Sequence, residues 1–192
     1  MIVYHQNIKW NYYVADFETT VYEGQTETEV WASAVVKMNT ENVKIFHSID
    51  ETFEYLKNLH ENIICYYHNL KFDGSFWLHY FLSNPQYKQA LISTSENPDD
   101  LKWVENVEDM EINTFKYIIS AQGIWYSITI RLDTGFLIEF RDSLKLLPFS
   151  VKKLGKDFQT KHKKLEMEYE GYRYAGCEIT EEEKQYIAND VL

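Results

Sequence analysis

The order of strand-like and helix-like segments is the sequence feature that most constrains the fold of this chain. Three strand-like segments, residues 11–17, 29–37 and 43–49, lead the chain, and each is rich in β-branched and aromatic residues. Strands that alternate with helices follow them. This order predicts a single α/β domain in which helices flank a mixed sheet.

Helical and apolar patterns place the later elements. Residues 50–60 carry apolar side chains at helical spacing, with Asp50 as the predicted N-cap. The continuous apolar run 62–67 predicts a buried strand, and a second helical pattern begins at Asp73. The remaining predicted elements are strands near 117–120, 124–130 and 135–142, a basic helix near 150–158, and a final helix that begins near Thr180 with a capping box to Glu183.

Length and composition also limit the class of protein. The chain has 192 residues, of which 45% are hydrophobic, so one domain, 1–192, can bury a full core without a disulfide or a metal. The two cysteines, Cys65 and Cys177, lie far apart in the sequence, which fits a reducing cytoplasm. Because no run of about 18 apolar residues occurs, we expect no membrane partner. The polar residues 84–114 are predicted to form an irregular insert.

The charge of the chain is unevenly distributed. The net charge is −11, but residues 141–164 carry eight basic residues against two acidic ones. That segment therefore carries +6 and the remainder of the chain −17. Such a distribution is typical of a protein that binds phosphates at one place and divalent cations at another. A solvated basic face is the alternative interpretation.

Four acidic residues occupy positions where a metal site can form. Asp16 and Glu18 lie at i and i+2 of a predicted strand, so their side chains point to the same face. Asp73 follows the apolar strand at a strand-to-helix corner, where ligand sites of α/β sheets collect. Tyr186 and Asp190 share one face of the final helix. Hard cations such as Mg²⁺ and Mn²⁺ prefer carboxylate oxygens of this kind.

Each of these acids also has an ordinary structural explanation. The pair Asp16 and Glu18 could be a solvated strand end, Asp73 an N-cap and Asp190 a surface residue below a partly buried tyrosine. Their joint placement on a strand end, a strand-to-helix corner and a late helix favours a shared site.

The motifs that contain these acids resemble the DEDD exonucleases, in the variant with a tyrosine. More closely, the chain resembles the N-terminal 3′–5′ exonuclease domain of protein-primed family B DNA polymerases of small tailed phages. The resembling segments are spread over nearly the whole chain and are DFETT (16–20), YHNLKFDG (67–74), RDSLKLLPFSVKKLGKDF (141–158) and ITEEEKQYIANDV (179–191).

The resemblance implies a ribonuclease H-like fold and a proofreading 3′–5′ exodeoxyribonuclease that acts on the 3′ end of single-stranded DNA. It implies that two divalent ions, Mg²⁺ or Mn²⁺, support a two-metal hydrolysis of the phosphodiester. The metal ligands would be Asp16, Glu18, Asp73 and Asp190. Tyr186 would orient the attacking water or the scissile phosphate without serving as a general base, because an ordinary phenol is a poor base at neutral pH.

The resemblance also assigns residues to the substrate. Those that correspond to ligands of the single-stranded 3′ end are Thr19, His68, Asn69, Phe72, Ser143 and Leu144. A catalytic lysine of the family corresponds to Lys164 in KLEMEY, with Lys163 adjacent as the alternative. Nothing functional is assigned to residues 84–114.

The polymerase motifs of the family are absent, since the sequence stops two residues after Asp190. We therefore expect a domain excised from a longer polymerase of a phage-infected bacterial host, with the polymerase domain and a terminal (primer) protein as partners. A natural stand-alone nuclease is the alternative. Two other functions also stay open: a docking module for single-stranded DNA or a primer protein, and an RNA-directed nuclease of the same fold.

Overall fold

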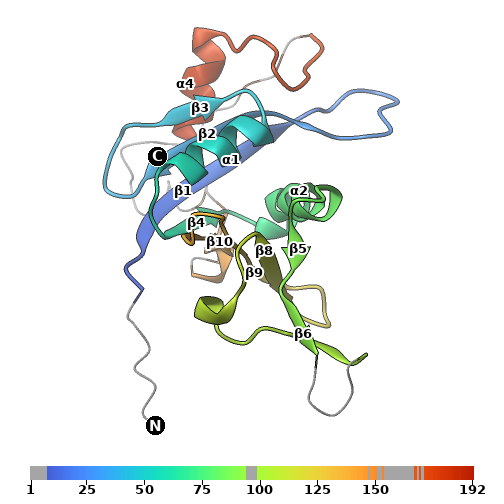
Figure 1. Ribbon diagram of the computed structural model, residues 1–192. Coiled ribbons are helices and arrows are strands. Elements are labelled where there is room, and N and C mark those ends of the chain that lie inside the picture. Colours follow the sequence, from blue (N-terminus) through green and yellow to red (C-terminus); the bar gives the residue numbers. More distant parts are fainter. Residues whose placement is uncertain are drawn as a thin grey trace.

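A mixed sheet of eight strands forms the centre of the computed structural model, which describes residues 8–93, 99–146, 148–150, 153, 167, 169 and 171–192 (Figure 1). Within these ranges the strand order is β3-β2-β1-β4-β10-β9-β8-β5. The strands are β1 (Asn11–Thr19), β2 (Val30–Lys37), β3 (Lys44–Phe46), β4 (Ile63–Tyr67), β5 (Lys88–Gln89), β8 (Thr114–Ile119), β9 (Trp125–Arg131) and β10 (Leu137–Asp142).

The central strands are parallel and the strands next to them are antiparallel. β4 runs parallel to both β1 and β10, whereas β2 pairs with β1, and β9 with β10, in antiparallel fashion. The central position of β4 explains its apolar run, because both of its faces are covered. Its pairing with β1 extends only from Asn11 to Val14, so the acidic end of β1 projects beyond the end of β4.

Helices cover both faces of the sheet. On one face, α1 (Ile49–Asn58) and α2 (Leu70–Ser83) enclose the main core, in which Phe17 of β1 packs with Tyr67 and Trp77. On the other face, α4 (Glu181–Asn189) packs its Ile187 against β2 (Figure 1). Side chains alternate along β1, so Phe17 enters the main core while the acids on either side of it face α4.

The helix starts differ in detail from the sequence-based prediction. Ser48, not Asp50, caps α1, because its extended backbone lets its hydroxyl accept the N–H of Glu51 at 3.1 Å. The helix α2 begins at Leu70, three residues before Asp73, and follows Asn69 in the left-handed region at φ 71°. Asp73 is therefore inside the first turn and is not the cap. The capping box of α4 is confirmed.

Residues 84–114 are more regular than predicted. They contain β5, a separate two-stranded sheet of β6 (Leu91–Ser93) and β7 (Leu101–Trp103), and the 3-10 helix η1 (Val107–Asp109). A small core of Ala90, Val104 and Met110 holds this segment together. The basic helix predicted near 150–158 falls largely outside the described residues. None of the helices that the structure describes combines the length and the apolar character needed to span a bilayer.

Candidate metal and nucleic-acid site

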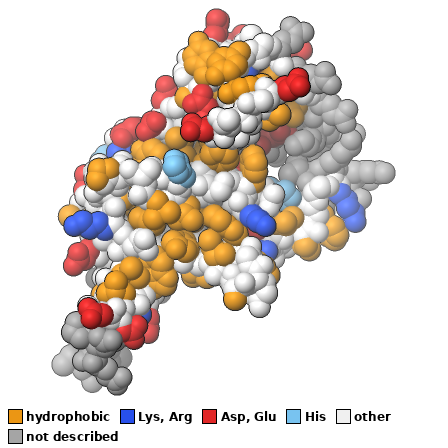
Figure 2. Space-filling view, turned by 90° about the vertical axis from the view of Figure 1, so that its right-hand side faces the viewer, with side chains coloured by type: hydrophobic (Ala, Val, Ile, Leu, Met, Phe, Trp, Pro, Cys, Tyr) orange, Lys and Arg blue, Asp and Glu red, His pale blue; other side chains and the backbone are white. Residues whose placement is uncertain are grey.

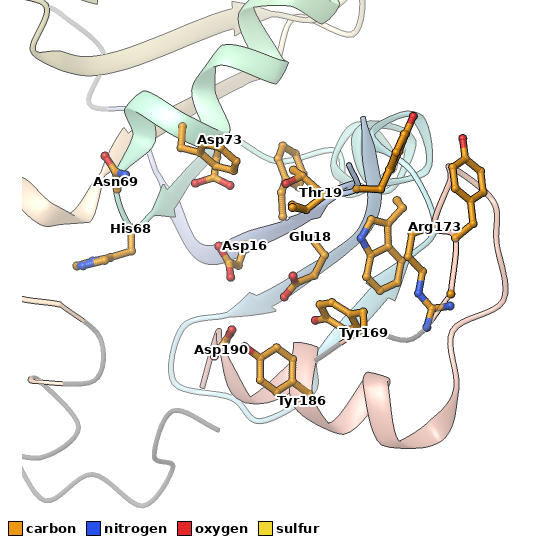
Figure 3. A pocket seen from close by; sticks show the side chains of 17 residues that line it. Asp16, Glu18, Thr19, His68, Asn69, Asp73, Tyr169, Arg173, Tyr186 and Asp190 are labelled. Carbon is orange, nitrogen blue, oxygen red and sulfur yellow. The ribbon is translucent and has the colours of Figure 1, made fainter. Parts of the chain in front are cut away.

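A pocket of about 550 Å³ opens where β1 projects beyond β4 (Figure 3). Its walls come from the end of β1, the corner between β4 and α2, Tyr169, residues 171–173 and the helix α4. All four acids of the predicted metal site line it. The fold thus joins residues that are more than 170 positions apart in the sequence.

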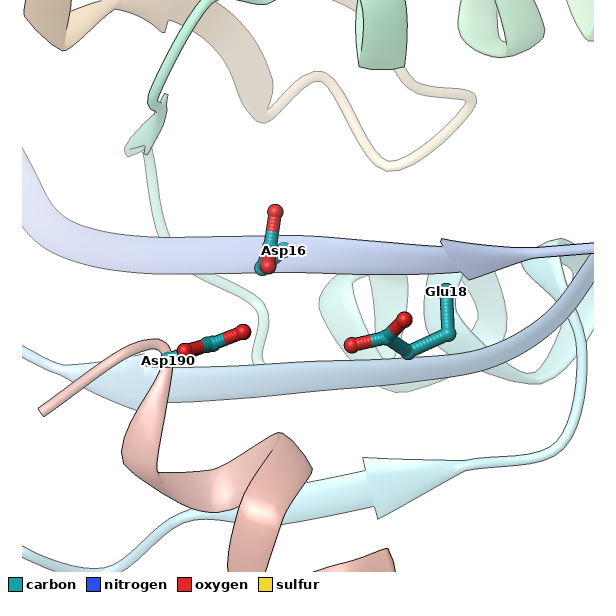
Figure 4. A group of neighbouring side chains, drawn as sticks. All are labelled: Asp16, Glu18 and Asp190. Carbon is teal, nitrogen blue, oxygen red and sulfur yellow. The ribbon is translucent and has the colours of Figure 1, made fainter. Parts of the chain in front are cut away.

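Three carboxylates form a close cluster in this pocket. Asp16, Glu18 and Asp190 each offer one oxygen, and these three oxygens all lie within 4.8 Å of one another (Figure 4). The two acids of β1 face α4, and Ile187 on that helix is buried against β2, which sets the position of Asp190 at the helix end. Like charges at this separation repel each other, so a cation between them would stabilise the cluster.

Asp73 lies in the same pocket but outside the three-carboxylate cluster. Its side chain is 3% exposed, and its Oδ1 has no hydrogen-bond partner among the residues that the structure describes. Burial, and then the charge of Asp16, raise the pKa of Asp73 to about 8, against opposing backbone hydrogen bonds from Asp73 and Phe17. Figure 3 shows the Asp73 carboxylate turned toward Asp16. A buried oxygen without a partner beside other acids fits a cation ligand.

Two tyrosines face the carboxylates from the side of α4. Burial and the charges of Asp190 and Glu18 raise the pKa of Tyr186 to about 12, so its phenol stays protonated at neutral pH. Tyr169 was not assigned a role from the sequence. It packs edge-on against Trp31 at 4.8 Å and against Tyr186 at 5.8 Å, and burial together with Glu18 raises its pKa strongly. In the sequence, its position at the end of KLEMEY was the one feature that could have indicated a role for it.

The predicted substrate residues divide into two groups. Those that line the pocket are Thr19, His68, Asn69 and Phe72. Ser143 and Leu144 belong to the neighbouring 3-10 helix η2 (Ser143–Lys145) and do not line it. Ser143 is nevertheless joined to the first group, because its Oγ lies 3.1 Å from Nδ1 of His68.

Asp142 connects these two groups, a role that the sequence did not reveal. Its buried carboxylate accepts the N–H of Asn69 at 3.2 Å and the N–H of Leu144 at 2.9 Å. One oxygen thereby fixes the corner before α2 relative to η2. The two segments are 73 or more residues apart, so no local pattern could have indicated the bond.

The predicted basic segment can be described only in part. Arg141 and Lys145 are described, and they lie 2.7 Å from Glu139 and 3.9 Å from Asp142, respectively. Lys164 lies outside the described residues, as does the neighbouring Lys163. Figure 2 shows Lys and Arg scattered singly over one face around a band of hydrophobic side chains. Phosphate binding by the segment stays a prediction.

Comparisons with known proteins point to one group. The family described as DNA polymerase type B, organellar and viral, matches residues 54–192. The DNA polymerase of Bacillus phage Nf is 36% identical over an alignment of 181 residues, and the match covers 92% of this chain and 28% of that protein. The DNA polymerase of Streptococcus phage Cp-1 is 35% identical over an alignment of 153 residues, and the match covers 73% of this chain and 22% of that protein.

Solved structures agree with the sequence comparisons. The structure of phi29 DNA polymerase complexed with single-stranded DNA superposes with a TM-score of 0.75 at 33% identity. The match covers 94% of this chain and 29% of that one. Together with the mixed sheet and its flanking helices, the match confirms the predicted ribonuclease H-like fold class. The chain spans less than a third of the length of the polymerases that it matches.

Proposed function

The chain belongs to the type B DNA polymerases of organelles and viruses, and we propose that it removes nucleotides from the 3′ end of single-stranded DNA within such a polymerase. The observation that carries this proposal is that one pocket contains both the cluster of Asp16, Glu18 and Asp190 and the buried Asp73. Proofreading of the growing strand is the role that such an activity would have beside a polymerase domain.

The donor set fits divalent cations. All four side chains offer hard oxygen ligands, and the unpartnered Oδ1 of Asp73 supplies the buried atom that such a site leaves for an ion. Asp16, Glu18, Asp73 and Asp190 would hold the ions, and we propose two of them, Mg²⁺ or Mn²⁺. Bound there, they would lower the pKa of the attacking water and offset charge on the departing 3′ oxygen.

The protein's own residues would orient the reactants. Tyr186, with its raised pKa, donates a hydrogen bond to the attacking water or to the scissile phosphate and does not accept a proton. Asn69 can hydrogen-bond to sugar or phosphate, because the bond to Asp142 holds its backbone in place. The half-exposed ring of Phe72 can stack on an unpaired base.

Single-stranded DNA is the substrate that the comparisons favour. The phi29 polymerase, which shares this fold, is described in complex with single-stranded DNA. We propose the same ligand for this chain, with the rest of the polymerase as its covalent partner and a terminal (primer) protein as a further one. RNA remains the competing substrate, and a matched ribose oligonucleotide decides between the two.

A time course with a 5′-labelled single-stranded DNA oligonucleotide tests the proposal. We expect stepwise shortening from the 3′ end with Mg²⁺ or Mn²⁺ and none with EDTA. The variant Asp16→Ala/Asp73→Ala should be inactive, whereas Asp133→Ala, an exposed acid in the turn before β10, should act like the parent chain. Trimming that persists in the double variant would contradict the proposal. Tight binding with no metal-stimulated shortening would favour a docking module instead.

A further inference from the structure

Three exposed tyrosines stand at one end of the pocket. Tyr22, Tyr172 and Tyr174, here called the tyrosine cluster, are 43%, 64% and 49% exposed. The ring centroids of Tyr22 and Tyr172 are 5.2 Å apart, and those of Tyr172 and Tyr174 are 5.9 Å apart with an interplanar angle of 28°. Tyr22 and Tyr172 also line the pocket that contains the four acids. Large aromatic rings left open to solvent beside a site call for a physical reason.

The surrounding contacts hold these rings outward. Arg173, between the two later tyrosines, forms an ion pair with Glu183 of α4 and lies over the ring of Trp31 at 5.1 Å. Since Arg173 is anchored inward, its two neighbours are directed outward. The next residues are tied down as well, because the N–H of Ala175 donates to Glu29 at 3.0 Å and that of Gly176 to the carbonyl of His47 at 2.8 Å.

The tyrosine cluster occupies the end of the pocket opposite to His68 and Asn69, two of the predicted strand ligands. Figure 3 shows His68 and Asn69 on one side of Asp16 and Glu18, and Arg173 on the other. A strand held at the carboxylates would extend along this line. The scissile phosphate would lie at the acids, and a nucleotide next to it would lie in the same pocket as Tyr172.

The charge at this end favours a base over a phosphate. Arg173 is already paired with Glu183, and the loop between β1 and β2 adds Glu23, Glu27 and Glu29. These acids repel phosphates, whereas exposed phenol rings present apolar faces to a base. Stacking on such rings does not depend on which base is present, as a nuclease that removes any nucleotide requires.

We propose that the tyrosine cluster is a base-stacking subsite for single-stranded nucleic acid bound at the carboxylates. This inference rests on the proposed function, since it adds a contact to the same substrate. It assigns substrate binding to residues outside the motifs that suggested the activity, and it predicts an effect at one nucleotide position.

The test measures kcat/KM for removal of the first nucleotide with Mg²⁺. We expect Tyr172→Leu/Tyr174→Leu to lower kcat/KM about fivefold or more, mainly through KM, because stacking on an aromatic ring is worth ~1–3 kcal/mol. Tyr22→Leu, on a different segment, should act in the same direction. The matched control is Tyr12→Leu, because Tyr12 is 44% exposed on β1 but does not line the pocket.

Substrates with one abasic site at each of the last four positions locate the contact. At one position the abasic site should lower kcat/KM of the parent chain, and the tyrosine double variant should be insensitive there. If the parent chain trims and the double variant has the same kcat/KM, this inference fails while the proposed function stands. The exposed rings would then be assigned to contact with a protein partner. Equal abasic sensitivity of parent and variant at every position would also overturn it. If the parent trims nothing, the proposed function itself fails.

Discussion

Asp73 differs from the other acids of the pocket in its degree of burial. It sits in the first turn of α2, shielded from water, whereas Asp16, Glu18 and Asp190 are partly exposed. Its pKa of about 8 means that the metal-free protein must protonate it or tolerate a buried charge near neutral pH. The stability of the fold therefore depends on whether this one residue is protonated, charged or bound to a metal ion.

Asp73→Asn should therefore stabilise the metal-free protein at pH 8. The folded-state pKa lies above the ordinary 3.8, so the contribution of Asp73 to the stability of the parent chain is full below about pH 4 and is lost as the pH rises toward 8. We expect a gain of up to ~5 kcal/mol at pH 8, because a tenfold change in proton affinity is worth ~1.4 kcal/mol. Urea unfolding of the parent chain and the variant in EDTA, at pH 4 and at pH 8, measures this gain. Equal stability of the two proteins at pH 8 would rule the coupling out.

Tyr186→Phe should slow trimming without changing its pH dependence. The phenol of Tyr186 stays protonated near neutral pH because its pKa is about 12, so the variant loses a hydrogen-bond donor and not a titrating group. We expect about a tenfold loss in kcat, the equivalent of one hydrogen bond. Rates between about pH 6 and pH 9 provide the comparison. Disappearance of a basic limb in the variant would contradict this role.

At the scale of elements, α4 places Asp190 through interactions at its opposite end. The hydroxyl of Thr180 accepts the N–H of Glu183, and the Glu183 carboxylate accepts the N–H of Thr180 at 2.8 Å. Glu183 also pairs with Arg173. The capping box and the ion pair with Arg173 therefore both fix the start of the helix, while Asp190 lies at its C-cap.

Thr180→Ala should impair both stability and metal use. Loss of the cap is expected to cost about 1 kcal/mol of unfolding free energy and to raise the Mg²⁺ concentration for half-maximal trimming, because Asp190 becomes less firmly placed. Ser48→Ala is the matched control, since it removes the cap of α1, which lies away from the pocket. It should lose similar stability and keep its metal requirement. The same metal requirement in both variants would refute the role of α4.

Individual elements also show which parts of the fold could be predicted from the sequence. The apolar run that became β4 was predictable because burial on both faces leaves no polar alternation. The start of α2 was missed, since it depends on Asn69 adopting a left-handed conformation. β5 has two residues, too few to carry a periodic pattern. In the site, the acids followed from motifs, but the bonds of Asp142 and the place of Tyr169 depend on tertiary contacts.

At the scale of the whole molecule, the pocket brings together both layers of the domain. Asp73 comes from the layer of α1 and α2, and Asp190 from the opposite layer. The acids of β1 lie between them. An ion bound by all of these side chains would connect the layers across the end of the sheet.

Divalent metal should therefore raise the stability of the entire domain. At a free Mg²⁺ or Mn²⁺ concentration of about a hundred times Kd, linkage predicts a gain of ~2.7 kcal/mol over the protein in EDTA. Thermal unfolding with and without metal measures it. Asp16→Ala/Glu18→Ala should abolish the gain, while Asp133→Ala should keep it. A gain that survives in the first variant would place the ion elsewhere.

The alternation along β1 has a consequence for quality control of the purified protein. Phe17 fills the main core while its neighbours Asp16 and Glu18 face the pocket. A slip of one residue in the pairing of β1 would bury the acids and expose the phenylalanine. Core packing and the site therefore require the same register of β1. Molecules in which this register is shifted cannot contribute to the measured rate. Specific activity would then report the correctly folded fraction of a preparation.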